Sequence, residues 1–439
     1  MKEKANLDST LGNKKGKNDS REISPGDKVS IRTVHETFEG NLIESHEPGL
    51  VLLKLKNGYN FGIKKEDIVS INVIEHKTSK ESKRQIKINP ALKNVDVIIT
   101  GGTISSKVDY ASGGVKWLTN PEDLFELYPE IFKICNVRKV IVPFMKASEN
   151  MDSSDWQEIA KICEKSLNDS EVSGVIITHG TDFLHYTAAA LSFFLRDLNK
   201  PVVLTYAQRS SDRASSDADL NLQCAAKVAV SDIAEVVLVG HGSWNDDFCY
   251  ALLGSKVRKI HSSRRDAFKP INIKPIAKVS SNGLEKISHH HLRDDSKKVK
   301  LDSSFNDKVA LIKFYPGMDS EIFDYLASRY QGIVIETSGL GHLAIDEARK
   351  NLLPAIKKAI DNGLIVCAAA QTVYGRLDPL VYSPGRKLMQ SGIIFLEDML
   401  SETAYVKLGW VLAHRQWKDK IKEKMLENVS GEINNRLEE

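Results

Sequence analysis

Short apolar strands that alternate with longer helical segments constrain the fold of this chain more than any other feature. From residue 95 onward, runs rich in β-branched residues recur at 95–100, 139–142, 174–178, 202–205 and 236–239. A second block repeats the pattern at 309–313, 333–336, 364–369 and 393–395. Because consecutive parallel strands need a long crossover, usually a helix, the pattern predicts two α/β domains whose parallel sheets are covered on both faces.

Two helix starts are indicated by capping patterns within the first block. Asn120 and Pro121 suit an N-cap and a first helical position ahead of apolar residues with helical spacing. Ser154 and Gln157 have the spacing of a capping box, in which each side chain bonds the backbone N–H of the other residue. Both patterns favour helices between the predicted strands.

The N-terminal region follows a different period. Between residues 25 and 74, apolar and polar residues alternate in short runs, and Asn57-Gly58 separates two of them. Asn-Gly supplies the positive φ values that a two-residue hairpin turn requires, so the flanking runs are predicted to pair as an antiparallel hairpin. We expect a small β-barrel module. It has little room for a catalytic pocket, which favours a binding or docking role.

Composition sets the remaining boundaries. Residues 76–93 carry six basic residues against one acid and suit a linker. We expect a disordered basic tail at 1–22, the β-barrel module at 23–75, the linker at 76–93, an α/β domain at 94–276, a connector at 277–307 and a second α/β domain at 308–439. The last helix should dock on its domain, since one helical face carries Trp410, Trp417, Ile421 and Met425.

Composition also excludes several classes of protein. A chain of 439 residues with 41% hydrophobic and 27% charged residues is neither disordered nor collagen-like. Its net charge of +3 does not suggest a free-standing nucleic-acid binder. Five cysteines without C-x-x-C spacing indicate neither a disulfide framework nor a zinc ribbon. With no apolar signal core and no long apolar run, we expect a cytoplasmic protein that does not cross a membrane.

The residues that can carry chemistry follow two of the predicted strands. The first strand ends in Thr100-Gly101-Gly102-Thr103-Ile104, and the third ends in Thr178-His179-Gly180-Thr181-Asp182. Open α/β sheets bind ligands outside the carboxyl ends of their strands. A threonine hydroxyl there can act as a nucleophile if a base activates it, and a lysine with a depressed pKa can serve, with Lys259 as one candidate.

Other readings of these motifs are weaker. The phosphate-loop pattern G-x-x-x-x-G-K-[ST] is absent from the sequence. Residues 339–344 match G-x-G-x-x-A, but a lone fingerprint so late in the chain better suits a tight turn that borders the cleft. The histidines at 289–291 have no thiol or carboxylate at ligand spacing, so we expect a solvated loop and no metal site. Strand-end threonines can also bond only their local backbone.

In combination, the two threonine motifs and Lys259 resemble the type I and II asparaginase/glutaminase family over about residues 95–415. Within it the chain resembles the family of D-type subunits of archaeal glutamyl-tRNA(Gln) amidotransferase. That closer resemblance rests on the N-terminal module and on the motifs at 107–110, 148–151, 207–212, 256–259, 263–268 and 402–408.

The resemblance implies catalytic roles for four residues. Thr103 is expected to attack the side-chain amide carbon and form an acyl-enzyme, with Tyr110 assisting its proton transfer. Thr181 and Lys259 are expected to form a second hydroxyl–base pair. Each role follows from the position of the residue in the family motif.

The resemblance also implies how the donor amino acid binds. Asp182 is expected to bind its α-amino group, and Ser148 and Glu149 align with the family's substrate-binding turn. Phe183 stands where a small or polar residue is usual, and Tyr206 stands where glycine is usual. These departures are expected to reshape the pocket and to bear on donor preference more than on reaction type.

Partners and cofactors follow from the same resemblance. The chain is expected to release ammonia from glutamine or asparagine, for conversion of Glu-tRNA(Gln) to Gln-tRNA(Gln) by the E-type subunit of the amidotransferase, its partner. A homodimer within a heterotetramer is expected. No cofactor is expected in this chain, and ATP and Mg are expected on the partner.

Two other hypotheses compete with this interpretation. A free-standing cytoplasmic L-asparaginase would explain residues 95–415 equally well, but not the N-terminal module. A non-catalytic RNA-binding or scaffolding protein would explain the basic linker, but not the set of catalytic residue types.

Overall fold

The structure is a computed structural model, and it describes residues 23–43, 45, 49–56, 60–76, 88–108, 115–117, 128–209 and 215–438. The predicted disordered tail, the Asn57-Gly58 turn, most of the basic linker, the helix start at Asn120 and Tyr110 lie outside the described residues. The chain divides into two compact units. One comprises residues 1–85, 106–118 and 210–216, and the other comprises 86–105, 119–209 and 217–439.

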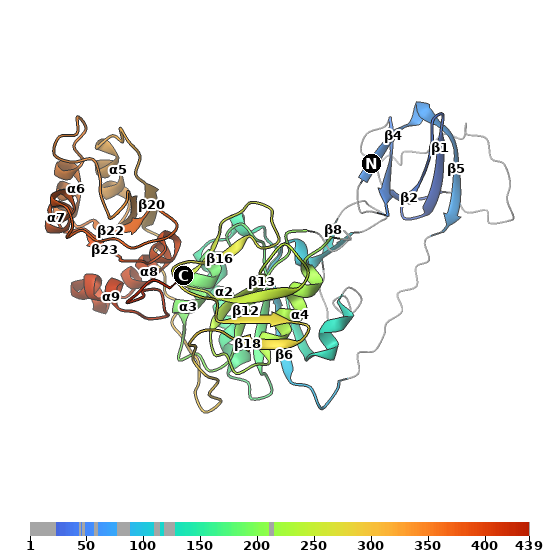
Figure 1. Cartoon of the computed structure of the whole chain (residues 1–439), viewed down its shortest axis with the longest axis horizontal. Helices are drawn as coiled ribbons and strands as arrows, with labels where there is room; N and C mark the ends of the chain where they lie inside the picture. The colour runs from blue at the N-terminus through green and yellow to red at the C-terminus, as the bar shows by residue number, and fades with distance from the viewer. Residues whose placement is uncertain are drawn as a thin grey trace, which may run out of the picture. The chain divides into compact units, whose positions relative to one another are not determined.

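The first unit contains a five-stranded antiparallel sheet, drawn in blue in Figure 1. Its strands are β1 (Lys28–Thr33), β2 (Thr37–Ile43), β3 (Leu50–Leu55), β4 (Asn60–Lys64) and β5 (Ile68–Glu75), in the order β4-β3-β2-β1-β5. Alternate apolar residues, among them Val29, Ile31 and Leu53, form the core. β3 and β4 pair as the predicted hairpin. No pairing between described residues joins β4 to β5, so closure into a barrel stays a prediction.

A short hairpin belongs to the same unit. It consists of β7 (Ser106–Val108) and β8 (Val115–Trp117), which pair in antiparallel register. The motif at 107–110 begins within β7, and its Tyr110 lies outside the described residues.

The second unit begins with the predicted parallel sheet. β6 (Asn94–Ile99), β9 (Asn136–Ile141), β10 (Gly174–Thr178), β12 (Val202–Thr205) and β13 (Val236–His241) are all parallel to their neighbours in this part of the sheet. Every residue of β10 and β12 is buried, which requires cover on both faces of the sheet. The crossovers contain α2 (Ser153–Leu167), α3 (Leu184–Phe194) and α4 (Ala218–Ala229).

This sheet is mixed rather than wholly parallel, which corrects the prediction. β14 (Phe248–Leu253), β17 (Ala277–Ser280) and β18 (Gly283–Lys286) extend it in antiparallel fashion. The links β13–β14 and β17–β18 are too short for a crossover, so they force antiparallel pairing. The expected connector at 277–307 therefore begins with two strands of the sheet.

The start of α2 also differs from the prediction. The N-cap is Asp152, whose carboxylate accepts from the backbone N–H of Ser154, and Asp155 completes the capping box. Gln157 instead donates from Nε2 to the carbonyl oxygen of Ser303 at 2.7 Å. Asp and Ser both suit an N-cap, so the sequence placed the helix start two residues too late.

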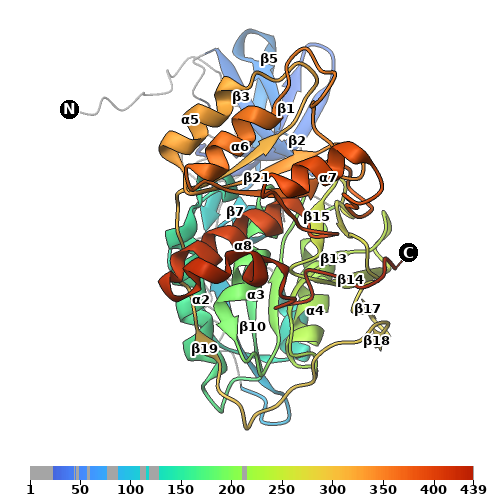
Figure 2. The ribbon, with the colours of Figure 1, turned by 90° about the vertical axis from the view of Figure 1, so that its left-hand side faces the viewer.

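The second α/β block is a four-stranded parallel sheet in chain order. It contains β20 (Val309–Lys313), β21 (Gly332–Thr337), β22 (Ile365–Ala370) and β23 (Ile394–Phe395), with α5 (Glu321–Arg329), α6 (Leu353–Asp361) and α7 (Ser383–Gln390). α8 (Ser401–Ala413) contacts both β21 and α3, and Figure 2 shows it between them. α9 (Ile421–Leu426) docks through the fully buried Met425, but Trp410 lies on α8 and Trp417 in a 3-10 turn, so the prediction of one last helix that carries these residues on one face is wrong.

Smaller elements lie between the main strands. β11 (Leu195–Arg196) pairs with β19 (Lys300–Leu301), and β15 (Val257–Lys259) pairs with β16 (Phe268–Pro270). Of the 3-10 turns, η2 (Thr103–Ser105) and η4 (Ser148–Asn150) carry predicted site residues. The others are η1 (Lys65–Asp67), η3 (Pro129–Lys133) and η5 (Arg415–Lys420).

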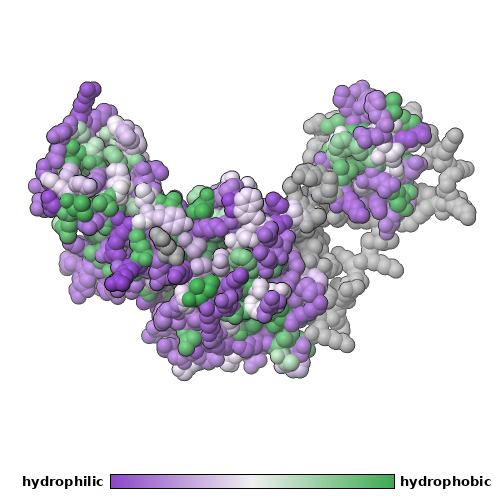
Figure 3. Space-filling view, viewed as in Figure 1, coloured by the Kyte–Doolittle hydropathy of each residue, from purple (hydrophilic) through white to green (hydrophobic). Residues whose placement is uncertain are grey.

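The surface is mostly hydrophilic on the face drawn in Figure 3, with apolar residues scattered over it. Among the described residues, no helix combines the length and the apolar character that crossing a membrane requires.

Two fully buried ion pairs brace the second unit. Lys256, between β14 and β15, donates to both the carboxylate and the carbonyl oxygen of Asp398. Lys407 of α8 pairs with Glu432 near the end of the chain. The side chains of all four residues are 0% exposed, so neither charge can turn to water if its partner is lost.

Replacing Lys256 should therefore destabilise the second unit strongly. We expect Lys256→Met to lower the free energy of unfolding by about 3–5 kcal/mol, because the Asp398 carboxylate is left buried without its cation. Lys358→Met, which breaks an exposed pair with Asp324, should cost less than about 1 kcal/mol. Urea unfolding measures both changes. Equal losses of unfolding free energy in the two variants would contradict a structural role for the Lys256–Asp398 pair.

Candidate active site

The loops that follow three neighbouring strands meet through their backbones. The N–H of Thr100 donates to the carbonyl oxygen of Thr178 at 3.1 Å, and the N–H of Lys146 donates to that of Thr100 at 3.0 Å. Gly101 and Gly102 have φ of +131° and +82°, which side chains rarely tolerate. A Cβ on Gly102 would lie 2.6 Å from the backbone nitrogen of Gly180. Glycine is therefore required for the two threonine loops to touch.

Thr103 and Thr181 occupy corresponding places in these two loops. Thr103 is the first residue of η2 and is partly buried, directly after the glycine pair. Thr181 is partly buried and directly follows Gly180. The backbone contact between Gly102 and Gly180 thus brings both predicted hydroxyls to the same edge of the sheet.

Lys259 joins the second threonine to a carboxylate. Its Nζ atom donates to Thr181 Oγ1 at 2.9 Å and to Asp182 Oδ1 at 2.8 Å. The side chain of Lys259 is only 8% exposed, whereas that of Asp182 is 63% exposed. The structure therefore brings together the hydroxyl, the amine and the carboxylate that the sequence indicated.

Ser148 links the loop that follows β9 to the loop that carries Thr181 and Asp182. It is buried in η4, and its Oγ accepts from the backbone N–H of Phe183 at 3.2 Å. Glu149 is exposed in the same turn, and its predicted contact with the donor stays a prediction. Tyr110 lies outside the described residues, so its predicted role stays open.

A neutral histidine lies behind the second threonine loop. His179 is fully buried, and its Nδ1 lies 2.7 Å from the carbonyl oxygen of Gly180 while Nε2 lies 2.9 Å from Thr187 Oγ1. A neutral ring that donates at Nδ1 and accepts at Nε2 satisfies both contacts. Burial lowers the pKa of His179 to about 4. The ring therefore stays uncharged at neutral pH and shapes the loop.

A cavity of about 320 Å³ lies beside Lys259 and Asp182. Phe183 lines it and is 43% exposed, so this departure from the family pattern does bear on the pocket. Tyr206 does not line it. Its buried ring packs on Phe268 and its hydroxyl donates to the carbonyl oxygen of Arg265 at 2.8 Å, so Tyr206 lies in the core and its effect on donor preference stays a prediction.

Three residues of this cavity had no role in the prediction. Arg258 directly precedes Lys259 on β15, His185 lies on α3 and Glu402 lies in the first turn of α8. Arg258 and Glu402 form an ion pair, with Nε 2.9 Å from Oε1. Burial, followed by the positive charges of Arg258 and Lys259, lowers the pKa of His185 to about 3. Both Glu402 and Arg258 belong to motifs of the sequence, but nothing local signals that they pair.

The other motifs do not join this site. Residues 338–342 form a tight turn in which the N–H of His342 donates to the carbonyl oxygen of Ser338, and none of them lines the cavity beside Lys259. His291 pairs with Glu235. Within the described part of the chain, no group of three histidine, cysteine, aspartate or glutamate side chains could hold a metal ion.

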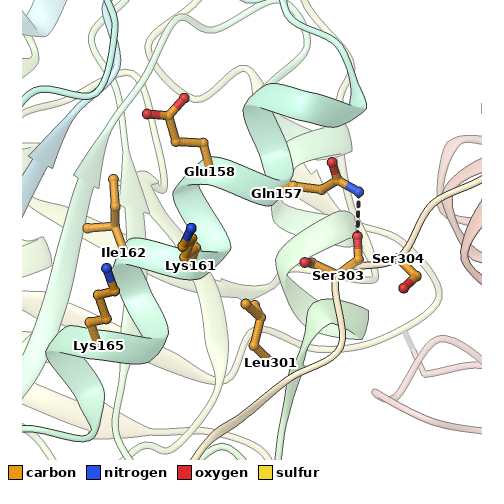
Figure 4. A pocket seen from close by; sticks show the side chains of 8 residues that line it. All are labelled: Gln157, Glu158, Lys161, Ile162, Lys165, Leu301, Ser303 and Ser304. Carbon is orange, nitrogen blue, oxygen red and sulfur yellow. Dashed lines mark hydrogen bonds between the residues drawn. The ribbon is translucent and has the colours of Figure 1, made fainter.

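A larger cavity, of about 600 Å³, lies between α2 and the segment around Ser303 (Figure 4). Figure 4 shows the side chains of Lys161 and Lys165 along one side and Leu301 facing them. No residue of the two threonine loops lines this cavity, so size alone does not mark the candidate active site.

Comparison with known proteins identifies the families of the three parts of the chain. The family described as "Asparaginase, N-terminal" matches residues 94–291, "Glutaminase/Asparaginase C-terminal domain" matches 308–425, and "GatD N-terminal domain" matches 23–74. The thermostable L-asparaginase from Thermococcus kodakarensis has a TM-score of 0.70 at 28% identity, over 78% of this chain and 99% of that chain.

Two curated relatives match almost the full chain. The D-type subunit of glutamyl-tRNA(Gln) amidotransferase from Pyrococcus furiosus is 48% identical over 94% of this chain and 95% of its own length. Its counterpart from Pyrococcus abyssi is 45% identical over the same two shares.

The two matched α/β domains define the class, which is that of the asparaginase-type amidohydrolases. The match of the N-terminal module and the near-complete coverage of the two relatives then identify the family within that class. The chain belongs to the family of D-type subunits of glutamyl-tRNA(Gln) amidotransferase.

The buried neutral state of His179 makes stability depend on pH. An unfolded histidine takes up a proton below its ordinary pKa, whereas folded His179, with its pKa lowered to about 4, resists protonation. The unfolded state therefore binds more protons in this window, and stability is lost as pH falls from about 6.5 to 4, by about 3 kcal/mol in total for this group.

Replacing this histidine should remove part of the pH dependence. His179→Asn keeps a donor for Gly180, so we expect its free energy of unfolding to fall less steeply than that of the parent between about pH 6.5 and 4. His291→Asn changes a side chain that is 76% exposed and is the matched control. Parallel curves for the parent and His179→Asn would show that the assignment is wrong.

Proposed function

We propose that this chain is the glutamine-hydrolysing subunit of a tRNA-dependent amidotransferase. The observation that carries the proposal is the contact of Lys259 Nζ with both Thr181 and Asp182. The loop that carries Thr103 lies beside them, because Gly102 packs closely on Gly180. A hydroxyl, an amine and a carboxylate are the groups needed to activate a nucleophile and to hold an amino-acid donor. The family that the chain belongs to supports the role as a subunit of an amidotransferase.

Thr103 attacks the donor's side-chain amide carbon and forms an acyl-enzyme, and ammonia leaves. Tyr110 assists the transfer of the Thr103 proton. Thr181 and Lys259 form the second pair, in which the hydroxyl donates and an uncharged Nζ accepts when a proton moves. Water then hydrolyses the ester to regenerate Thr103 and release glutamate.

Asp182 binds the donor's α-ammonium group. In the structure one of its oxygens already accepts from Lys259. A carboxylate has about four acceptor positions, so the second oxygen provides capacity for the ammonium. Ser148 and Glu149 contribute the turn on the other side of the donor, and Phe183 limits its size.

The ammonia passes to the E-type subunit of the amidotransferase, which converts Glu-tRNA(Gln) to Gln-tRNA(Gln). ATP and Mg act on that partner and not on this chain. The chain forms a homodimer within a heterotetramer in the cytoplasm. Asparagine is the alternative donor.

Replacing Thr103 tests the proposed nucleophile. Thr103→Val should lower glutamine hydrolysis by at least about a thousandfold, because the variant lacks the hydroxyl that forms the ester. Thr337→Val is the matched control, since Thr337 also ends a strand but donates to the carbonyl oxygen of Ala369 in the second domain. Ammonia release measures both, and comparable losses would argue against a special role for Thr103.

Dependence on the partner separates the proposal from a free-standing asparaginase. We expect ammonia release to rise when the E-type partner, ATP, Mg and Glu-tRNA(Gln) are added together. Steady release by the chain alone, unaffected by tRNA, would favour the free-standing asparaginase.

A further inference from the structure

The segment that presents Lys259 carries three cations, and each pairs with a different carboxylate. Lys256 pairs with Asp398, Arg258 pairs with Glu402, and Lys259 pairs with Asp182. Successive side chains of an extended strand point to opposite faces. Within β15, Lys259 therefore shares one face with the buried Val257 and Arg258 points the other way, while Lys256 directly precedes the strand.

The first two carboxylates belong to the second α/β domain, whereas Asp182 belongs to the first. Asp398 precedes α8, and Glu402 lies in its first turn. Thr403 of the same helix donates from Oγ1 to the carbonyl oxygen of Ser255 at 2.9 Å. Segment 255–258 is thus fixed to the second domain by these contacts and by Ser255 Oγ, which donates to the carbonyl oxygen of Ser430 at 2.6 Å.

Glu402 is well suited to hold Arg258 in place. It is 6% exposed, and a carboxylate in the first turn of a helix is favoured by the helix dipole. Arg258 is 24% exposed, so the pair is largely shielded from water and from screening by salt. Ser401 Oγ donates to Glu336 Oε1 at 2.6 Å, which ties the start of α8 to the end of β21.

We propose that Glu402 is a positioning residue, which acts through Arg258 to place the Lys259 amine against Thr181. The inference rests on the proposed function, because it assigns Glu402 to the same hydroxyl–base pair. It adds that a residue of the second domain, Glu402, helps to position Lys259, the base that the first domain carries.

Removing Glu402 should slow the reaction without removing any reacting group. We expect Glu402→Gln to lower kcat/KM for glutamine by about ten- to a hundredfold, since displacing a catalytic group by about 1 Å can cost that much. Glu397→Gln breaks another arginine–carboxylate pair, with Arg376, that does not line the cavity, and it should change kcat/KM by less than about twofold.

The pH profile distinguishes positioning from general stability. The charged or titratable groups around the Lys259 amine, taken from every neighbouring element, are Asp182, His179, His185, Tyr186, Arg258, His261 and Glu402. Loss of Glu402 leaves the Arg258 cation uncompensated, and loss of Arg258 leaves an anion. An added positive charge disfavours a protonated amine and an added negative charge favours it.

The two single variants should therefore shift the profile in opposite directions. The acid limb of kcat/KM should move to lower pH in Glu402→Gln and to higher pH in Arg258→Gln. The double variant should return toward the parent. Arg258→Lys keeps the charge but loses the planar donor, so it should give an intermediate rate with little change in unfolding midpoint.

These variants are compared in the full chain together with its E-type partner, by ammonia release from about pH 5 to 9, with Lys259→Met in parallel. If Lys259→Met keeps the parent rate, the proposed hydroxyl–base pair fails and the inference fails with it. If Lys259→Met is inactive but Glu402→Gln behaves like Glu397→Gln, or both single variants shift the limb the same way, only the inference is overturned.

Discussion

The close backbone contact between Gly102 and Gly180 is the constraint on which the candidate site depends. Parallel strands place their carboxyl ends at one edge of a sheet, but side chains would normally hold the following loops apart. Two glycines with positive φ after the first strand allow the backbones to touch. Thr103 and Thr181 follow that contact directly, so main-chain packing determines where both threonines lie.

Patterns with short range in sequence predicted most of the fold. The β-branched runs lie at or near the observed strands of both α/β blocks, because fully buried parallel strands leave a strong local signature. The prediction failed where the information was shared between segments. β17 and β18 join the first sheet through the pairing of β17 with the distant β14, and the N-cap of α2 was ambiguous between Asp152 and Ser154.

The site divides in the same way. The threonine loops could be found from the sequence, since each combines a strand end with glycine and a hydroxyl. Lys259 could be selected only through the family resemblance, as one lysine among many. Arg258 and Glu402 stand far apart along the chain, and the sequence contains no local signal that a helix of the second domain meets a strand of the first. A single position also does not reveal whether an aromatic side chain turns into a pocket or into a core, where the structure places Tyr206.

The pairing of three neighbouring cations with three separate carboxylates brings groups of both α/β domains to the segment that carries one amine. An isolated amine in a partly buried cleft would lose its charge or turn to water, whereas a single strong carboxylate partner would hold it protonated and unable to act as a base. Asp182 is the only one of the three carboxylates that bonds Lys259 among the described residues, and it is mostly exposed. Asp398 and Glu402 neutralise the two cations beside Lys259 without bonding it. The second domain can therefore hold the strand tightly, while the amine contacts one mostly exposed carboxylate and the Thr181 hydroxyl, as the proposed hydroxyl–base pair requires.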